Sequence, residues 1–178
     1  KNADAFISRG VAYRELGQHK DAIDDYTQAI RIDPEHATAY NNRGIAYRKI
    51  GVYQSAVEDY NTAIRIDPKY AGTYNNRGIV YRELGHYQRA IDDYNQAIRL
   101  DPKYAGAYNN RGVANSDLGL HQRAIEDFTQ AVRIDPEYAA AYTNRGIAFK
   151  KIGQFDRACV DFWKACDLGA CSPLRLEQ

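Results

Sequence analysis

Asparagines that recur at a fixed interval are the side chains of this chain best suited to hold a ligand. Two adjacent asparagines stand in each of three YNNRG segments, and a single one follows in a fourth related segment. A carboxamide both donates and accepts hydrogen bonds, so it can pair with the N–H and C=O groups of an extended peptide. Each such bond contributes only about 0.5 to 1.5 kcal/mol net, so several must act together. The candidate peptide-binding asparagines are Asn41, Asn42, Asn75, Asn76, Asn109, Asn110 and Asn144.

Basic side chains near these asparagines could select among peptides. Arg48, Arg82 and Lys150 follow the last asparagine of their segments at the same spacing. Arginine holds a carboxylate through two parallel hydrogen bonds. We therefore expect a protein or peptide ligand that carries an acidic side chain or a free C-terminus.

The interval between equivalent asparagines is 34 residues, and this spacing recurs along the whole chain and predicts its helices. Ala3, Ala37, Ala71, Ala105 and Ala139 begin five units of equal pattern, and residues are numbered below by their position in a unit, with these alanines as position 1. We predict one helix over positions 2–14, closed by a glycine, and a second over positions 17–30, closed by an Asp-Pro pair. A fixed period of this length is typical of a solenoid, in which each unit buries its apolar face against its neighbours. The predicted repeats are 3–36, 37–70, 71–104, 105–138 and 139–170, forming a single array over residues 1–178.

The units resemble the tetratricopeptide repeat. The signature of that family is matched in the second unit by Tyr40, Gly44, Tyr47, Ala56, Tyr60, Ala63 and Pro68, and all five units carry the pattern. The resemblance implies an all-α fold, a right-handed α-solenoid or superhelix of about ten antiparallel helices, and an interaction scaffold whose concave groove holds an extended peptide. An asparagine ladder of this kind resembles the one in the tetratricopeptide superhelix of the glycosyltransferase that attaches N-acetylglucosamine to nuclear and cytoplasmic proteins. In this interpretation the asparagines lie in the groove and have no packing role.

One departure from the family recurs in every unit and predicts internal ion pairs. Position 7, where the family usually has leucine, is arginine, and position 23 of the second helix is aspartate. An unpaired charge on this mostly apolar stripe would be costly. We therefore predict bridges such as Arg43 with Asp59; binding of an anion by these arginines is the alternative.

Other classes of function are not indicated by the composition. The formal net charge is +1, so the fifteen tyrosines lack the basic surroundings expected of a nucleic-acid binder. No apolar run approaches the roughly 20 residues of a membrane span, and the four histidines lack the spacing of a metal site. We expect no enzymatic activity, no cofactor and no membrane insertion. The compartment is open: the cytoplasm is favoured, and a removed leader is the alternative.

The last unit differs from the others and suggests further alternatives. Its outer helix carries Val160 and Trp163 where earlier units have acidic and small polar residues, which predicts an apolar patch for self-association. Residues 171–178 are expected to begin a short capping helix or a truncated extension. Cys159 and Cys166 are expected to be buried or free thiols, with a Cys166–Cys171 disulfide as the alternative. The chain could also be an assembly module, or the substrate-recognition arm of a larger enzyme.

Overall fold

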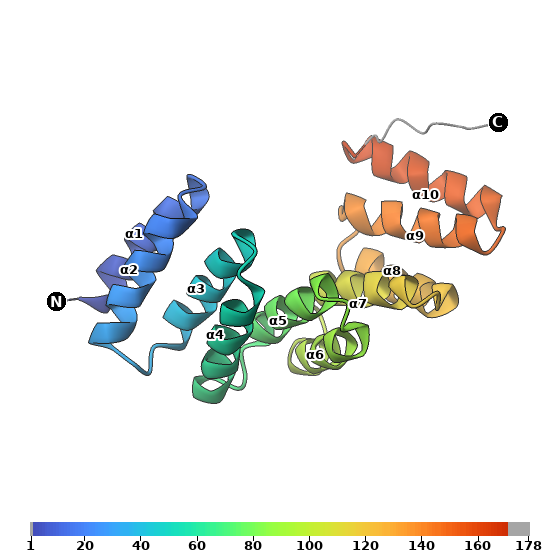
Figure 1. Ribbon diagram of the computed structural model, residues 1–178. Coiled ribbons are helices and arrows are strands. Elements are labelled where there is room, and N and C mark those ends of the chain that lie inside the picture. The colour runs from blue at the N-terminus through green and yellow to red at the C-terminus, as the bar shows by residue number, and fades with distance from the viewer. Residues whose placement is uncertain (1, 171–178) are drawn as a thin grey trace. The chain divides into compact units, whose positions relative to one another are not determined.

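The computed structural model describes residues 2–170, which form ten α-helices and no strand (Figure 1). The first helix of each repeat begins and ends one residue earlier than predicted, and the second helices of the first four repeats have the predicted bounds. The predicted cap over 171–178, including Cys171, lies outside the described residues. The helices are α1 (Ala3–Glu15), α2 (His19–Ile32), α3 (Ala37–Lys49), α4 (Tyr53–Ile66), α5 (Ala71–Glu83), α6 (Tyr87–Leu100), α7 (Ala105–Asp117), α8 (His121–Ile134), α9 (Ala139–Lys151) and α10 (Phe155–Asp167).

The helices belong to two compact units, residues 1–100 and 101–178. In the first unit α1 packs on α2, α3 on α4 and α5 on α6, and the second helix of a pair contacts the first helix of the next pair. In the second unit α7 packs on α8, α9 on α10, and α8 on α9. Each unit is thus a stack of helix pairs in chain order, as predicted. The assignment of all five repeats to one array stays a prediction.

Two kinds of turn connect the helices. After α1, Gly17 has a φ of 75° and the N–H of Gln18 donates to the carbonyl of Tyr13 at 2.8 Å, the pattern that closes a helix with a left-handed residue. After α4, a side-chain oxygen of Asp67 accepts from the N–H of Lys69 at 3.0 Å, while Pro68 has no N–H to satisfy. The aspartate of each Asp-Pro pair therefore shapes the turn that leads to the next first helix.

Within each pair an aromatic ring lies directly over a glycine. A Cβ added at Gly44 would lie 2.8 Å from Cε1 of Tyr60, and one at Gly112 would lie 2.6 Å from Cε1 of Phe128. Both rings are buried. Only glycine permits so close an approach of Tyr60 to Gly44 and of Phe128 to Gly112.

The fifth repeat ends differently and leaves apolar side chains exposed. Helix α10 closes at Gly169, which has a φ of 87°, in place of an Asp-Pro turn. Trp163 is 72% exposed and Val160 67% exposed. Cys166 is disulfide-bonded, so the expectation that it is a thiol is wrong. Cys159 is a free thiol, which is one of its two expected states, and it is exposed rather than buried. The equivalent Ile125 is buried in a cluster that contains Ala148 and Phe149 of the following helix, whereas no described helix follows α10.

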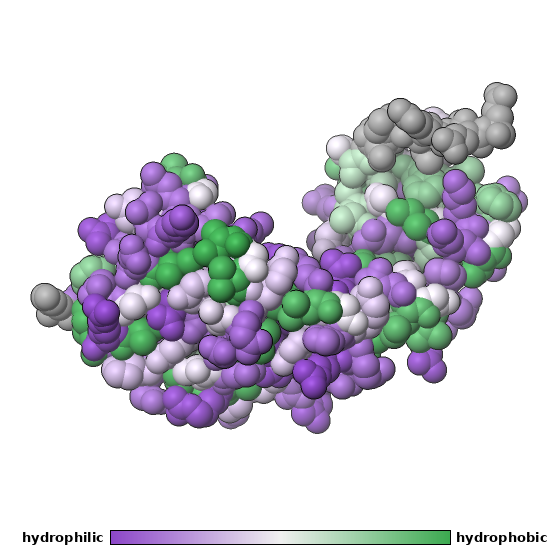
Figure 2. All heavy atoms as spheres, in the orientation of Figure 1, coloured by the Kyte–Doolittle hydropathy of each residue, from purple (hydrophilic) through white to green (hydrophobic). Residues whose placement is uncertain are grey.

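One face of the molecule is mainly polar (Figure 2). Figure 2 shows a face on which hydrophilic residues predominate and apolar residues form small, separate areas. No helix among the described residues has both the length and the apolar character needed to cross a membrane.

Candidate functional site

The arginine at position 7 of each repeat forms the predicted ion pair with the aspartate at position 23. Nε and Nη2 of Arg43 donate to the two carboxylate oxygens of Asp59, both at 2.8 Å. The other pairs are Arg9–Asp25, Arg77–Asp93, Arg111–Asp127 and Arg145–Asp161. This two-point hydrogen bonding confirms the prediction of internal bridges and occupies the edge of the guanidinium that an anionic ligand would need.

The same arginine also contacts the preceding repeat. Nη1 of Arg43 donates to Oγ1 of Thr27 at 3.0 Å, and the Thr27 hydroxyl donates to its own helix at the carbonyl of Ile23. Arg77 reaches Asn61 at 2.6 Å, and in the second unit Arg145 reaches Thr129 at 3.2 Å. The acceptor at position 25 of one repeat is thus tied to the arginine of the next repeat.

Aromatic rings and burial fix the guanidinium further. Cζ of Arg43 lies 5.6 Å from the ring centre of Tyr40 and 5.8 Å from that of Tyr47. The hydrogen bond to Asp59 raises the pKa of Arg43 above its usual range. The arginine therefore stays charged and acts in the scaffold rather than in a ligand site.

The asparagines at position 5 lie between repeats rather than on an open surface. Asn41 and Asn75 are each 5% exposed and Asn109 is 6% exposed. Oδ1 of Asn41 accepts from Nδ2 of Asn76 in the next repeat at 3.1 Å, and Oδ1 of Asn109 accepts from Nδ2 of Asn144 at 2.9 Å. The expectation that the asparagines have no packing role is therefore wrong for position 5: all three side chains are buried, and the next repeat of the same unit contacts Asn41 and Asn109.

The asparagines at position 6 are half-buried, and Asn76 and Asn144 are oriented by these contacts, whereas Oδ1 of Asn42 accepts from Nη1 of Arg14 at 3.4 Å. Each carboxamide has two N–H donors and one carbonyl acceptor. Asn76 and Asn144 each use one N–H to bond the buried amide of the preceding repeat. That bond fixes the plane of the side chain, and it leaves the second N–H and the carbonyl oxygen of the same amide available to a ligand.

The predicted basic residues have different surroundings. Nη1 of Arg48 donates to Oε1 of Glu83 in the next repeat at 2.9 Å, so a ligand carboxylate would have to compete with Glu83. Arg82 likewise interacts with another group of the chain, so its guanidinium is not free for a ligand. Lys150 is exposed near the C-terminal end of α9.

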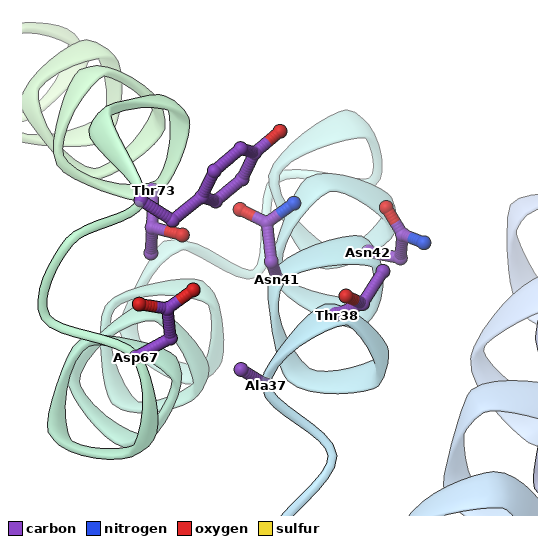
Figure 3. A pocket seen from close by; sticks show the side chains of 7 residues that line it. Ala37, Thr38, Asn41, Asn42, Asp67 and Thr73 are labelled. Carbon is purple, nitrogen blue, oxygen red and sulfur yellow. The ribbon is translucent and has the colours of Figure 1, made fainter. Parts of the chain in front are cut away.

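A pocket of about 270 Å³, lined by both polar and apolar groups, opens between the second and third repeats, within the first unit (Figure 3). Figure 3 shows the Thr73 hydroxyl and the Asn41 carboxamide facing one space, with the Asp67 carboxylate directed toward it from the turn. The sequence pattern pointed to the two asparagines and did not point to the other lining residues. The turn alone accounts for Asp67, and the residue type at the positions of Thr38 and Tyr70 varies between repeats. The pocket is lined by Ala37, Thr38, Asn41, Asn42, Asp67, Tyr70 and Thr73.

The described residues contain no group of three or more histidine, cysteine or acidic side chains that could hold a metal ion. The aspartates at position 23 are paired with arginine, and those of the turns accept backbone N–H groups. The chemistry open to the polar side chains of this site is to hold and orient a ligand group by hydrogen bonding.

Comparison with known proteins agrees with this geometry. Sequence models described as TPR repeat match residues 10–51, 46–85 and 80–119, and models described as tetratricopeptide repeat match 105–138 and 128–160. These are repeat families, and none of the matches is to a catalytic family. No curated protein sequence matches the chain.

Solved structures share the fold over nearly the whole chain. A crystal structure of MamA is 28% identical, with a TM-score of 0.78, and the alignment covers 93% of this chain and 91% of MamA. PilF of Pseudomonas aeruginosa is 22% identical, with a TM-score of 0.87 and coverages of 94% and 76%. YrrB, described as a TPR protein with an unusual peptide-binding site, is 22% identical, with a TM-score of 0.70 and coverages of 94% and 86%. At 22% identity PilF and YrrB show the fold alone.

Removing the cation of a central pair should destabilise the chain strongly. The side chains of Arg43 and Asp59 are 17% and 7% exposed, and Arg43→Met leaves the carboxylate without its partner. We expect a loss of about 3 to 5 kcal/mol in the free energy of unfolding near pH ~7, measured by urea denaturation.

The loss should depend on pH in a defined direction. Burial raises the pKa of Asp59, and Arg43 is the group that lowers it. In the variant the folded-state pKa therefore lies further above the unfolded value of about 3.9, so stability falls as the pH rises through this interval. The deficit of Arg43→Met should shrink as the pH is lowered toward about 4. Arg9→Met is the control: the Arg9 side chain is 59% exposed, so its removal opens the Asp25 carboxylate, which is 7% exposed, to water and should cost clearly less. Equal losses at the two sites would contradict the role of burial.

Proposed function

Because the chain belongs to the tetratricopeptide-repeat family, we propose that this protein-interaction scaffold binds an extended peptide segment along its first helices. The position-6 asparagines would contact the peptide backbone, Asn42 and Asn76 in the first unit and Asn110 and Asn144 in the second. The position-5 asparagines Asn41, Asn75 and Asn109 would act as positioning residues. All three are buried, and Asn41 and Asn109 each hold a position-6 amide by a hydrogen bond.

The observation that carries this proposal is the hydrogen bond from Asn76 to Asn41. It consumes one donor of Asn76 and fixes the orientation of the amide. The donor and acceptor that remain are the complement of one peptide group. A side chain that is already ordered loses less conformational entropy when a ligand binds, so each contact retains more of its free energy.

Charge selection would be shared among several residues. Lys150 is exposed and suits an acidic residue of the ligand. Arg48 bonds Glu83, so an acidic ligand residue there would exchange one ion pair for another at little net gain. Arg82 is expected to contribute in the same manner as Arg48.

Self-association through the last helix is a second candidate function. Val160 and Trp163 are exposed on α10 and occupy neighbouring positions on that helix. The same two positions hold Glu126 and Thr129 in the preceding repeat. A second copy that covers these two side chains would remove their apolar surface from water.

Asparagine substitutions test the peptide proposal. Short random peptides displayed on phage are selected against the unaltered chain, and the selected peptides are titrated by calorimetry. Asn42→Ala and Asn76→Ala should each weaken binding by about 0.5 to 1.5 kcal/mol, and the double variant by about 5- to 100-fold in Kd.

A matched control separates binding from folding. Gln54→Ala and Gln88→Ala remove exposed amides from the second helices α4 and α6, where each bonds a carboxylate of its own helix. Their double variant should bind like the unaltered chain. Asn76→Ala also leaves Oδ1 of the buried Asn41 without its partner, so its unfolding free energy is measured alongside. Undiminished binding by the Asn42/Asn76 double variant would sink the proposal.

Light scattering over a concentration series tests the second candidate. If α10 is an association surface, the mass of the unaltered chain should rise with concentration. The variant Val160→Glu with Trp163→Thr, which restores the residue types of the preceding repeat, should stay monomeric. A concentration-independent monomer of the unaltered chain would rule out this function.

A further inference from the structure

The pocket between the second and third repeats differs in charge from the basic residues along the first helices. Of its seven lining side chains, Asp67 is the only charged one. We propose that this pocket receives a basic side chain, arginine or lysine, of the bound peptide. The inference rests on the proposed function and adds to it the type of side chain that the bound peptide carries.

The hydrogen-bonding groups of the pocket suit a donor-rich cation. Oδ1 of Asp67 accepts from the N–H of Lys69 at 3.0 Å, and no described basic side chain pairs with its carboxylate. The hydroxyls of Thr38 and Thr73 can both accept hydrogen bonds. Arginine and lysine carry donors only, so they match a carboxylate and hydroxyl oxygens, whereas an acidic side chain would meet like charge.

The position of Tyr70 explains why the pocket is open. A Cβ added at Gly72 would lie 2.8 Å from Cζ of Tyr70, so the ring lies back over the first turn of α5. The residue is 55% exposed. In the second unit the equivalent tyrosine is Tyr138, and Ala140 stands in place of Gly72; the Tyr138 ring packs against the cluster of Ala131, Val132 and Ala141. Gly72 therefore lets Tyr70 stand beside the pocket, where its ring face can contact a cation.

The chain itself pairs a basic ring with an acid at the equivalent place one repeat earlier. His36 occupies the position of Tyr70, and Asp4 occupies the position of Thr38. Nε2 of His36 lies 3.4 Å from Oδ1 of Asp4. Between the second and third repeats both of these residues are replaced by neutral ones, so Asp67, whose equivalent in the first repeat is Asp33, carries the charge of the pocket.

Two variants probe the pocket without altering the asparagines. Asp67→Asn removes the charge and keeps an oxygen that can accept from Lys69. Asp135→Asn is the matched control, since Asp135 makes the same turn contact with Glu137 at 3.0 Å in the second unit. Gly72→Ala adds the Cβ that displaces Tyr70.

Peptides selected on the unaltered chain are resynthesised with arginine, lysine, alanine or glutamate at each site in turn. We expect one site at which arginine or lysine binds about tenfold or more tightly than alanine, and glutamate more weakly. Asp67→Asn should abolish that preference and leave the alanine peptide unchanged, Gly72→Ala should reduce the preference, and Asp135→Asn should preserve it. The inference would be overturned if the selected peptides bind through Asn42 and Asn76 but show no preference for a basic residue. It would also be overturned if that preference survives Asp67→Asn. In both cases the proposed function stands.

A titration with N-acetyl-arginine amide, followed by NMR, separates the two failures when no peptide is selected. Shifts of the Tyr70 and Thr73 amide signals that disappear in Asp67→Asn would support the pocket and leave the peptide proposal without support. The absence of these shifts in the unaltered chain would overturn the pocket as well.

Discussion

The arginine at position 7 is the constraint on which the arrangement of the repeats depends. In the second repeat the side chain of Arg43 is 17% exposed, and a charge without partners in such a place would be unfavourable by several kcal/mol. Arg43 meets this requirement with the carboxylate of Asp59, the rings of Tyr40 and Tyr47, and the hydroxyl of Thr27 in the preceding repeat. Because the partners come from two repeats, satisfying the charge also fixes how one repeat lies on the next.

The polar face follows from this scaffold. With the repeats in register, the position-5 amide of one repeat is covered by the next and accepts a hydrogen bond from its position-6 amide. The buried amide thereby orients its half-buried neighbour. Residues that look redundant in the sequence thus divide into positioning groups and groups that can contact a ligand. The pocket at Asp67 adds a charge of opposite sign to that of Arg48 and Lys150.

Much of the fold and part of the site could be predicted from the sequence. The helices follow from the glycine and Asp-Pro stops, and the Arg43–Asp59 pair follows because both residue types recur together at fixed positions. A helical wheel could not separate Asn41 from Asn42, since burial of Asn41 depends on the adjacent repeat. The pocket could not be predicted because it depends on the placement of one ring, that of Tyr70, over Gly72. The exposure of Cys159 could not be predicted from the earlier repeats, because there a following helix covers the equivalent residue, as it covers Ile125.

The most direct test of the central claim is a double-mutant cycle between Thr27 and Arg43. Urea denaturation gives the unfolding free energies of the unaltered chain, Thr27→Val, Arg43→Met and the double variant. If the arginine ties neighbouring repeats together, the two substitutions should be coupled by about 1 kcal/mol, because removing either partner deletes the same hydrogen bond. Losses that add to within about 0.3 kcal/mol would show that the contact does not hold the repeats and would contradict the account.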